Sequence, residues 1–412
     1  MVRVNHLLWI VVAVVLGTVG QAADVPNAGK DWPQFRGPNR DGVSKETGIL
    51  SSWPEGGPKV LWRTELGQGY SGISVARGRL FTMFGVGSDE FVGCFDAATG
   101  EQLWRVRADK TWKDRFGDGP RSTPTVDGDV VYALSARGTL LALGVKDGAT
   151  LWTRDLREDF DAHPPQWGVS TSPHVEGRLL LVNVGGGKGS SVVAFHKKSG
   201  EEVWRSQDRK AGYSTPVAVT IGGVRQVLFF TGTALLSLLP EDGSLHWEQA
   251  WKTSYDVNAS TPIFIPPDKI FISTGYDVGA ALLRVKTEGE RATVETVWKD
   301  RVMRNKFSSS VYVDGHLYGF DESTLKCIDA ETGEMKWRAR GYGHGSLTYA
   351  DGHLVVLGDL GALALVEATP EEYREKGRFK VFKDKTWTVP TLAGGKLYLR
   401  DQKELVSLDI SG

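Results

Sequence analysis

Few residues of this chain have the spacing that catalysis or metal binding requires. The chain has only two cysteines, Cys94 and Cys327, and its eight histidines are scattered without the spacing of metal ligands. The nucleophile elbow G-x-S-x-G, the zinc motif H-E-x-x-H and a phosphate-binding loop do not occur in the sequence. The residue pattern therefore favours a binding or structural protein over an enzyme.

Eight other residues could bind a ligand, because each precedes the first strand of an expected sheet. These candidates for a channel-mouth site are Tyr70, Arg121, Trp167, Tyr213, Asn258, Phe307, His344 and Trp387. Aromatic rings with a few polar groups at a concave mouth suit a sugar, a peptide or a quinone-like ring. The alternative interpretation is that these side chains fill a narrow channel and stack on one another.

The eight residues belong to a unit that recurs along the chain. Clear copies run from Ser122 to Trp152 and from Ser309 to Trp337, and each ends in a glycine turn followed by a tryptophan strand. Equivalent tryptophans lie 39 to 52 residues apart, at Trp62, Trp104, Trp152, Trp204, Trp247, Trp298 and Trp337, and Phe382 takes the next place. This period fits one four-stranded propeller blade per copy.

The two ends of the repeat region complement each other. Thr388–Ile410 supplies three strands without a tryptophan strand, and Lys59–Thr64 is a tryptophan strand with no strands before it. We therefore expect an all-β, eight-bladed β-propeller of four-stranded antiparallel blades, closed by an N-terminal strand that completes the last blade. Only Thr369–Lys376 carries a helix signal, and it predicts a short surface helix.

The two cysteines occupy equivalent positions of their repeats. Equivalent positions of blades one and six lie several blades apart on a circle, which is farther than the Cα separation of about 7 Å that a disulfide permits. We expect Cys94 and Cys327 to be free, buried thiols.

The N-terminus has the three parts of a secretory signal peptide. A charged start precedes an apolar run, and small residues follow up to Ala22. The run is shorter than the roughly 20 apolar residues of a spanning helix, so we expect cleavage after Ala22, with a retained anchor as the alternative. The protein is expected to be periplasmic or secreted.

The remaining chain divides into a leader and the propeller. Residues 23–58 form the leader, and residues 59–412 form the eight blades. We expect the leader residues Trp32, Phe35 and Trp53 to pack against the side of the ring.

The repeat resembles a known family. The pattern D-A-x-T-G-x-x-x-W, carried by Ala97 to Trp104 and by Ala330 to Trp337, resembles the tryptophan-docking repeat of pyrroloquinoline-quinone (PQQ)-type propellers. That group includes the quinoprotein alcohol dehydrogenases and the non-catalytic lipoprotein of the outer-membrane β-barrel assembly machinery. The resemblance covers Lys59 to Ile410 and implies an eight-bladed fold, but it does not imply a bound quinone.

The residues that form the quinone site of quinoprotein dehydrogenases have few counterparts in this sequence. An adjacent cysteine pair is missing, and Arg121 alone is a weak match for the arginine that holds the quinone carboxylates. The nearest candidates for calcium ligands are Asp256 and Asn258, and the preceding blades offer no carboxylate at the same place. No cofactor is expected, and PQQ and calcium belong only to the alternative function.

These observations favour an exported, non-catalytic PQQ-like β-propeller that acts as a protein-interaction or ligand-binding scaffold in the periplasm or cell envelope. The alternative is a PQQ- and calcium-dependent quinoprotein alcohol dehydrogenase. The chain has 49 Lys+Arg and 50 Asp+Glu, without a block of like charge, so no nucleic-acid partner is expected. We expect a monomer that does not span the membrane and binds an envelope protein or a small ligand.

Overall fold

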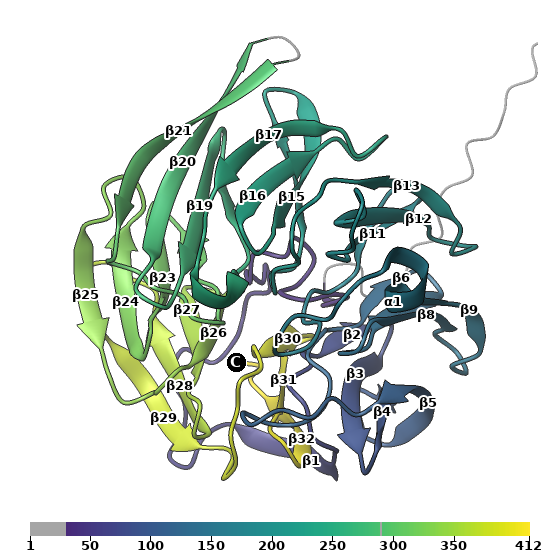
Figure 1. Cartoon of the computed structure of the whole chain (residues 1–412). Helices are drawn as coiled ribbons and strands as arrows, with labels where there is room; N and C mark the ends of the chain where they lie inside the picture. The colour runs from purple at the N-terminus through teal and green to yellow at the C-terminus, as the bar shows by residue number, and fades with distance from the viewer. Residues whose placement is uncertain (1–29, 289–290) are drawn as a thin grey trace, which may run out of the picture.

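The computed structural model describes residues 30–288 and 291–412. The predicted signal peptide of residues 1–22 lies outside these residues. Eight four-stranded antiparallel sheets form a ring, which confirms the predicted eight-bladed β-propeller (Figure 1). Within the described residues no helix is long and apolar enough to cross a bilayer.

Each blade runs from an inner strand at the channel to an outer strand at the rim. Blades 1 to 4 consist of β2 (Ser74–Ala76), β3 (Arg79–Val86), β4 (Asp89–Asp96) and β5 (Gln102–Lys110); β6 (Thr125–Asp127), β7 (Val130–Leu134), β8 (Thr139–Gly144) and β9 (Thr150–Asp155); β10 (His174–Glu176), β11 (Leu179–Asn183), β12 (Val192–His196) and β13 (Glu202–Ser206); and β14 (Val217–Ile221), β15 (Val224–Phe230), β16 (Ala234–Leu238) and β17 (Leu245–Ala250).

Blades 5 to 8 follow the same order, and blade 8 uses the first strand of the chain as its outer strand. They consist of β18 (Ile263–Ile265), β19 (Lys269–Thr274), β20 (Gly279–Glu288) and β21 (Arg291–Asp300); β22 (Val311–Val313), β23 (His316–Asp321), β24 (Thr324–Asp329) and β25 (Met335–Ala339); β26 (Ser346–Ala350), β27 (His353–Leu357), β28 (Ala362–Glu367) and β29 (Glu375–Lys380); and β30 (Thr391–Ala393), β31 (Lys396–Arg400), β32 (Glu404–Asp409) and β1 (Lys59–Glu65).

The ring closes by hydrogen bonding between the two ends of the repeat region. β1 pairs antiparallel with β32, from Lys59 opposite Asp409 to Glu65 opposite Glu404. This pairing gives both terminal strands a partner in the same blade, so neither of them is left as an unpaired ring end.

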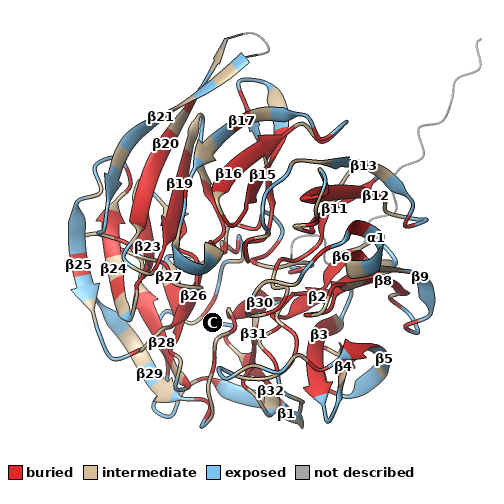
Figure 2. Cartoon of the chain, viewed as in Figure 1, coloured by how far each residue is buried: buried red, intermediate tan, exposed pale blue. Residues whose placement is uncertain are grey.

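The core lies on the second and third strands of the blades. In β3 all six residues from Leu80 to Gly85 are buried, whereas the outer strand β5 is mostly exposed or half-buried (Figure 2).

Cys94 in β4 and Cys327 in β24 are both buried and free, as predicted. Burial raises the pKa of the Cys94 thiol to about 11 and that of Cys327 to about 12.

The tryptophans of the outer strands contact the next blade. Six indole N–H groups donate to a carbonyl oxygen there at 2.7 to 3.2 Å, in the pairs Trp62–Ala97, Trp104–Val145, Trp152–Lys197, Trp204–Pro240, Trp298–Ala330 and Trp337–Thr369. The rings cover turn glycines of the next blade: Gly200 has a φ of +73°, and a Cβ there would lie 2.6 Å from the Trp152 ring. This contact explains why the turn requires glycine.

A bulge accompanies the outer strand of every blade. In blade 2 the register between β8 and β9 shifts after Ala142, which lies opposite Trp152, and the other blades show the same irregularity. Bulges increase local twist and redirect side chains. Trp247 departs from the common contact, since its N–H donates to Gln226 Oε1 of its own blade at 2.7 Å.

The helix predicted over Thr369–Lys376 is wrong. β29 begins at Glu375, and the residues before it are not helical. Two tertiary contacts fix this segment instead: the Thr369 carbonyl accepts from Trp337, and the Tyr373 hydroxyl lies 2.7 Å from that of Tyr342. Packing against the neighbouring blade therefore overrides helix propensity here. The described helices, α1 (Leu156–Phe160) and the 3₁₀ helix η1 (Ser254–Asp256), lie in connections between blades.

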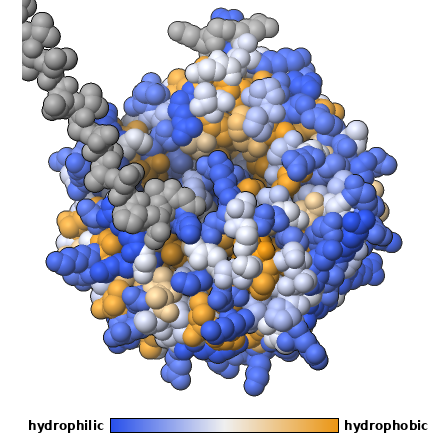
Figure 3. Space-filling model, turned by 180° about the vertical axis from the view of Figure 1, so that it is seen from behind, coloured by the Kyte–Doolittle hydropathy of each residue, from blue (hydrophilic) through white to orange (hydrophobic). Residues whose placement is uncertain are grey.

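The channel has two different mouths. Inner strands begin at the upper mouth, which faces the viewer in Figure 1, and end at the lower mouth, seen in Figure 3. The leader crosses the lower mouth and buries Trp32 there, so the prediction that Trp32 packs against the side of the ring is wrong. Trp53 does lie at the side, with its ring 5.7 Å from Phe379 of β29.

Candidate binding site at the upper mouth

Four of the predicted residues form a continuous group on one side of the upper mouth. The ring of Trp387 lies 5.1 Å from that of Tyr70 and 4.7 Å from that of Phe307, and Phe307 lies 5.8 Å from His344. All four side chains are partly exposed. The connections into blades 1, 6, 7 and 8 thus deliver one ring each to a shared aromatic surface.

Two more predicted residues meet on the opposite side. Trp167 and Tyr213 lie 5.7 Å apart, and the ring of Tyr255 in η1 stands edge-on to Trp167 at 6.3 Å. Tyr255 is 67% exposed, which is unusual for an aromatic residue of a folded domain. Burial raises the pKa of Tyr213 to about 12, so its hydroxyl stays protonated at neutral pH.

Phe116 joins the two groups, although the sequence analysis did not single it out. Its ring lies 6.3 Å from Trp387 and 6.4 Å from Trp167, and the side chain is 39% exposed. The connection between blades 1 and 2 carries it over the mouth. A single aromatic residue in the glycine-rich, charged segment DRFGDG (114–119) was the available signal. We call Tyr70, Phe116, Trp167, Tyr213, Tyr255, Phe307, His344 and Trp387 together the aromatic girdle.

Arg121 supports this connection and is not a free cation. Its guanidinium donates to the carbonyls of Gly117, at 3.0 Å, and Gly119, and it lies 5.8 Å from the centre of the Tyr70 ring. Desolvation lowers the pKa of Arg121, while Asp114 and Glu90 oppose that shift. The side chain therefore holds the backbone that presents Phe116.

Asn258 does not belong to the site surface. It is fully buried, and its amide nitrogen donates to the carbonyls of Thr231 at 2.8 Å and Trp251 at 3.1 Å. Its amide oxygen accepts from the Thr274 hydroxyl at 2.9 Å. The prediction that Asn258 lines the mouth is wrong because these contacts use the amide to connect blades 4 and 5.

The residues proposed for a quinone site do not fit that role. Both polar atoms of the Asn258 amide are engaged, and the Asp256 carboxylate forms an ion pair with Lys210 at 2.9 Å. Arg121 donates to two backbone carbonyls. Among the described residues no group of three or more His, Cys, Asp and Glu is placed to hold a metal ion.

Two ring nitrogens of the girdle have no hydrogen-bond partner among the described residues. The indole nitrogen of Trp387 and Nδ1 of His344 are buried without a hydrogen-bond partner in the described part of the chain. Lys385 places its ammonium 4.3 Å from the centre of the Trp387 ring and donates to the Phe116 carbonyl at 3.1 Å. Rings with a few oriented polar groups can stack on apolar side chains and bind backbone carbonyls.

Comparison with known proteins identifies related propellers. The sequence profile of the family described as "Outer membrane protein assembly factor BamB" matches residues 88–339. The BamB of Burkholderia pseudomallei is 26% identical over 320 residues, which cover 73% of this chain and 74% of that protein. The crystal structure of BamB from Moraxella catarrhalis superposes with a TM-score of 0.56 at 14% identity, covering 85% of this chain and 97% of that one.

A shorter match connects the chain to a quinoprotein. The quinoprotein ethanol dehydrogenase of Pseudomonas aeruginosa is 32% identical over 132 residues. These residues are 30% of this chain and only 21% of the dehydrogenase, so the similarity covers a small part of that enzyme.

Proposed function

Because this chain belongs to the family of the outer membrane protein assembly factor BamB, we propose that it is a non-catalytic scaffold that binds envelope proteins in the periplasm. A cleaved signal peptide at residues 1–22 would export it, and the leader and propeller would act as a monomer. Relatives named as assembly factors, over most of their length, support this proposal better than the short quinoprotein match.

The aromatic girdle carries the proposal for the binding surface. Phe116 and Tyr255 expose 39% and 67% of their surface at the upper mouth, where they can cover apolar side chains of a bound segment. The indole N–H of Trp387 has no hydrogen-bond partner in the described residues, so a segment that turns this partly exposed ring would gain a donor for one of its carbonyls. Large rings with one polar atom give contact area at low conformational cost, which suits recognition of protein segments.

The proposal can be tested with two girdle variants and one control. Phe116→Ala removes the ring that joins both sides of the girdle, and Trp387→Phe keeps a ring but reduces its surface and removes its N–H. Leu360→Ala is the matched control, because Leu360 is 68% exposed in the turn between β27 and β28 and lies outside the girdle.

The full-length variants would be tagged, and the envelope proteins that they retain would be quantified by mass spectrometry. We expect Phe116→Ala to reduce retention of the main partner by tenfold or more, Trp387→Phe to reduce it several-fold, and the Leu360 control to match the wild type. Equal retention by all four proteins would refute the girdle as the binding surface.

The quinoprotein alternative is tested on the same preparation. Calcium and PQQ would be added, and a quinone absorption band with alcohol-dependent dye reduction would be sought. Such turnover would replace the scaffold proposal by an oxidoreductase.

A further inference from the structure

The leader bonds to the inner strands of blades 1 and 2 at one repeated position. Trp32 and Val75 of β2 exchange two backbone hydrogen bonds, each of 2.8 Å. The carbonyl of the next leader residue, Pro33, accepts from the N–H of Val126 in β6 at 2.8 Å. Two consecutive leader residues thus cross from one blade to its neighbour.

The same position of blade 7 is used in the same way. The Tyr349 N–H donates to the carbonyl of Gly42 at 2.9 Å, and the Tyr349 carbonyl accepts from the N–H of Ser44 at 2.8 Å. Tyr349 precedes the last residue of an inner strand that ends in a two-residue turn. Because hydrogen-bonded and non-hydrogen-bonded pairs alternate, the backbone groups of this residue point away from the second strand, into the mouth.

In the described residues this position has no leader backbone bond in blades 3 to 6 and in blade 8, and the open positions of blades 4, 5 and 6 lie beside one hollow. In blades 4 to 6 the equivalent residues are Ala218 of β14, Phe264 of β18 and Tyr312 of β22. In β14 the turn at Gly222–Gly223 puts Ala218 in a non-hydrogen-bonded pair, so its N–H and carbonyl point into the mouth. Within residues 30–288 and 291–412 no leader backbone group bonds to any of these three residues.

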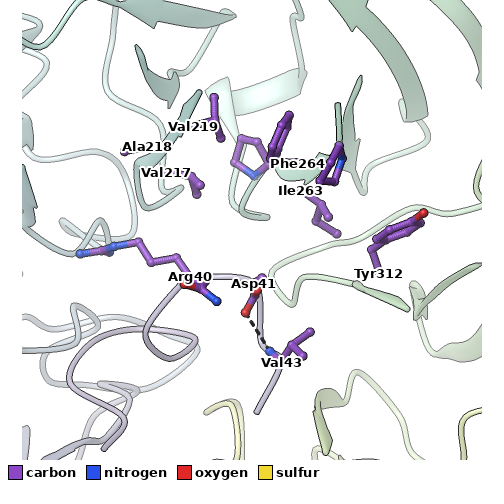
Figure 4. Close-up of a pocket in the computed structure, with 12 residues that line it drawn as sticks. Arg40, Asp41, Val43, Val217, Ala218, Val219, Ile263, Phe264 and Tyr312 are labelled. Carbon is purple, nitrogen blue, oxygen red and sulfur yellow. Dashed lines mark hydrogen bonds between the residues drawn. The ribbon is translucent and has the colours of Figure 1, made fainter. Parts of the chain in front are cut away.

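A hollow lies at these three positions. It has a volume of about 330 Å³, and Ala218, Phe264 and Tyr312 all line it, together with the leader from Asn39 to Asp41 (Figure 4). Seen from the lower side, the hollow is largely of hydrophobic colour with a hydrophilic rim (Figure 3). We call this part of the lower mouth the open sector.

The walls of the open sector indicate what it can bind. Val217, Val219 and Ile263 give it apolar sides, and Asp41 is the acidic residue among those that line it. The Asp41 carboxylate accepts from the Val43 N–H at 3.0 Å, and burial raises the pKa of Asp41. Arg36 already faces this carboxylate, and Arg40 turns its guanidinium away from the hollow to the Pro173 carbonyl (Figure 4). A basic side chain on the occupant would be a second cation beside Asp41 and would offset the remaining cost of burying the carboxylate.

We propose that the open sector binds an extended segment of a partner polypeptide through its main chain, which crosses from Ala218 to Phe264 as Trp32–Pro33 crosses from Val75 to Val126. The segment places an apolar or aromatic side chain in the hollow and a lysine or arginine beside Asp41. This site lies at the opposite end of the channel from the aromatic girdle, and its test does not depend on the girdle.

The test uses a synthetic peptide with the leader sequence KDWPQFRG (residues 30–37), which contains the crossing dipeptide and two basic residues. Its affinity for the full chain would be measured by titration calorimetry. Ala218→Pro removes the edge N–H in a position where an edge strand tolerates proline, and Ala218→Val adds similar bulk but keeps the N–H. We expect about tenfold weaker binding to the proline variant and an unchanged affinity for the valine variant.

Hydrogen exchange locates the bound peptide. Protection that the peptide induces in residues 217–221 and 263–265 supports the proposal. Equal affinity of both Ala218 variants, or protection confined to the upper mouth, overturns it. Protection that is present without peptide and is lost on dilution would identify a second copy of the chain as the occupant, and would also overturn it.

A second comparison does not depend on the folding of the proline variant. Asp41→Asn keeps the acceptor for the Val43 N–H but removes the charge. We expect it to weaken binding of the peptide about fivefold and to leave unchanged the binding of a peptide with glutamine in place of its lysine and arginine. The same loss for both peptides would contradict the role of Asp41.

Discussion

The two mouths of the channel are closed in different ways. At the upper mouth, side chains from separate connections meet as rings, and several remain partly exposed, from Phe116 to Trp387. At the lower mouth, the main chain of the leader and two buried arginines, Arg36 and Arg40, bond to backbone groups of the blades. Only the lower mouth is closed mainly by hydrogen bonds to backbone groups.

This difference distinguishes residues that are available to a partner from residues that stabilise the fold. A ring that is half-exposed contributes little to folding and is available to a partner, whereas a buried guanidinium that satisfies carbonyl groups is costly to remove. The acceptors of the six indole N–H groups also lie at the lower end of the blades, in or next to the turns before the outer strands. We therefore expect mutations of the inter-blade tryptophans and of the buried leader arginines at the lower side to affect stability, and mutations at the upper mouth, like those in the open sector, to affect binding.

The largest expected effect comes from a tryptophan between blades. Trp152→Ala removes a ring packed on Gly200 and a hydrogen bond to the Lys197 carbonyl, and should lower the free energy of unfolding by about 3–5 kcal/mol. Phe116→Ala also removes an aromatic side chain, but at the upper mouth. It should lower the free energy of unfolding by less than about 1 kcal/mol. Urea unfolding measures both. Similar losses for the two variants would remove the distinction between the mouths.

Two buried arginines of the leader at the lower mouth should contribute differently to stability. The Arg36 guanidinium donates to four carbonyls, including that of Ser310 at 2.6 Å, whereas Nε and Nη1 of Arg40 have no partner in the described residues. Arg36→Met should therefore cost about 3 kcal/mol, because it leaves buried carbonyls unpaired. Arg40→Met should change stability by less than about 1 kcal/mol, because it also removes a buried, unpaired charge. Thermal unfolding in one buffer ranks them, and a larger loss for Arg40→Met would contradict this account.

A smaller effect should appear on acidification. Burial lowers the pKa of His174 at the lower end of blade 3 to about 4; Glu176 opposes this shift, and the positive charges of Arg40 and Arg225 add to it. The unfolded chain takes up the proton near pH 6.5 and the folded chain only near pH 4, so stability falls as the pH drops between these values. We expect a loss of about 2 kcal/mol from pH 7 to pH 5.

The control for this effect is His174→Gln, whose stability should depend less on pH over the same range. Unfolding curves at pH 7 and pH 5 for both proteins provide the measurement. Identical pH dependence would show that His174 is not the group that titrates.

The repeat made the ring predictable, but it did not reveal how individual side chains are used. Trp152 and its equivalents mark the blades because a glycine turn and an indole must recur wherever two blades meet. Asn258 shares the position of Trp167 and Tyr213 in the repeat, yet its amide is buried, because groups from two neighbouring blades, the Trp251 carbonyl and the Thr274 hydroxyl, bond to it. Phe116 was missed because it lies five residues before Arg121, outside the position that recurs at the entrance of each blade.

The sequence by itself determined the number of blades, the strand that closes the ring and the free state of Cys94 and Cys327, since local periodicity and turn chemistry specify each of these. Only the tertiary structure decided the path of the leader, the loss of the expected helix at Thr369–Lys376 and the open sector beside Ala218. Each of these depends on which backbone groups remain unpaired after the blades have assembled, and that information is not local to any segment of the chain.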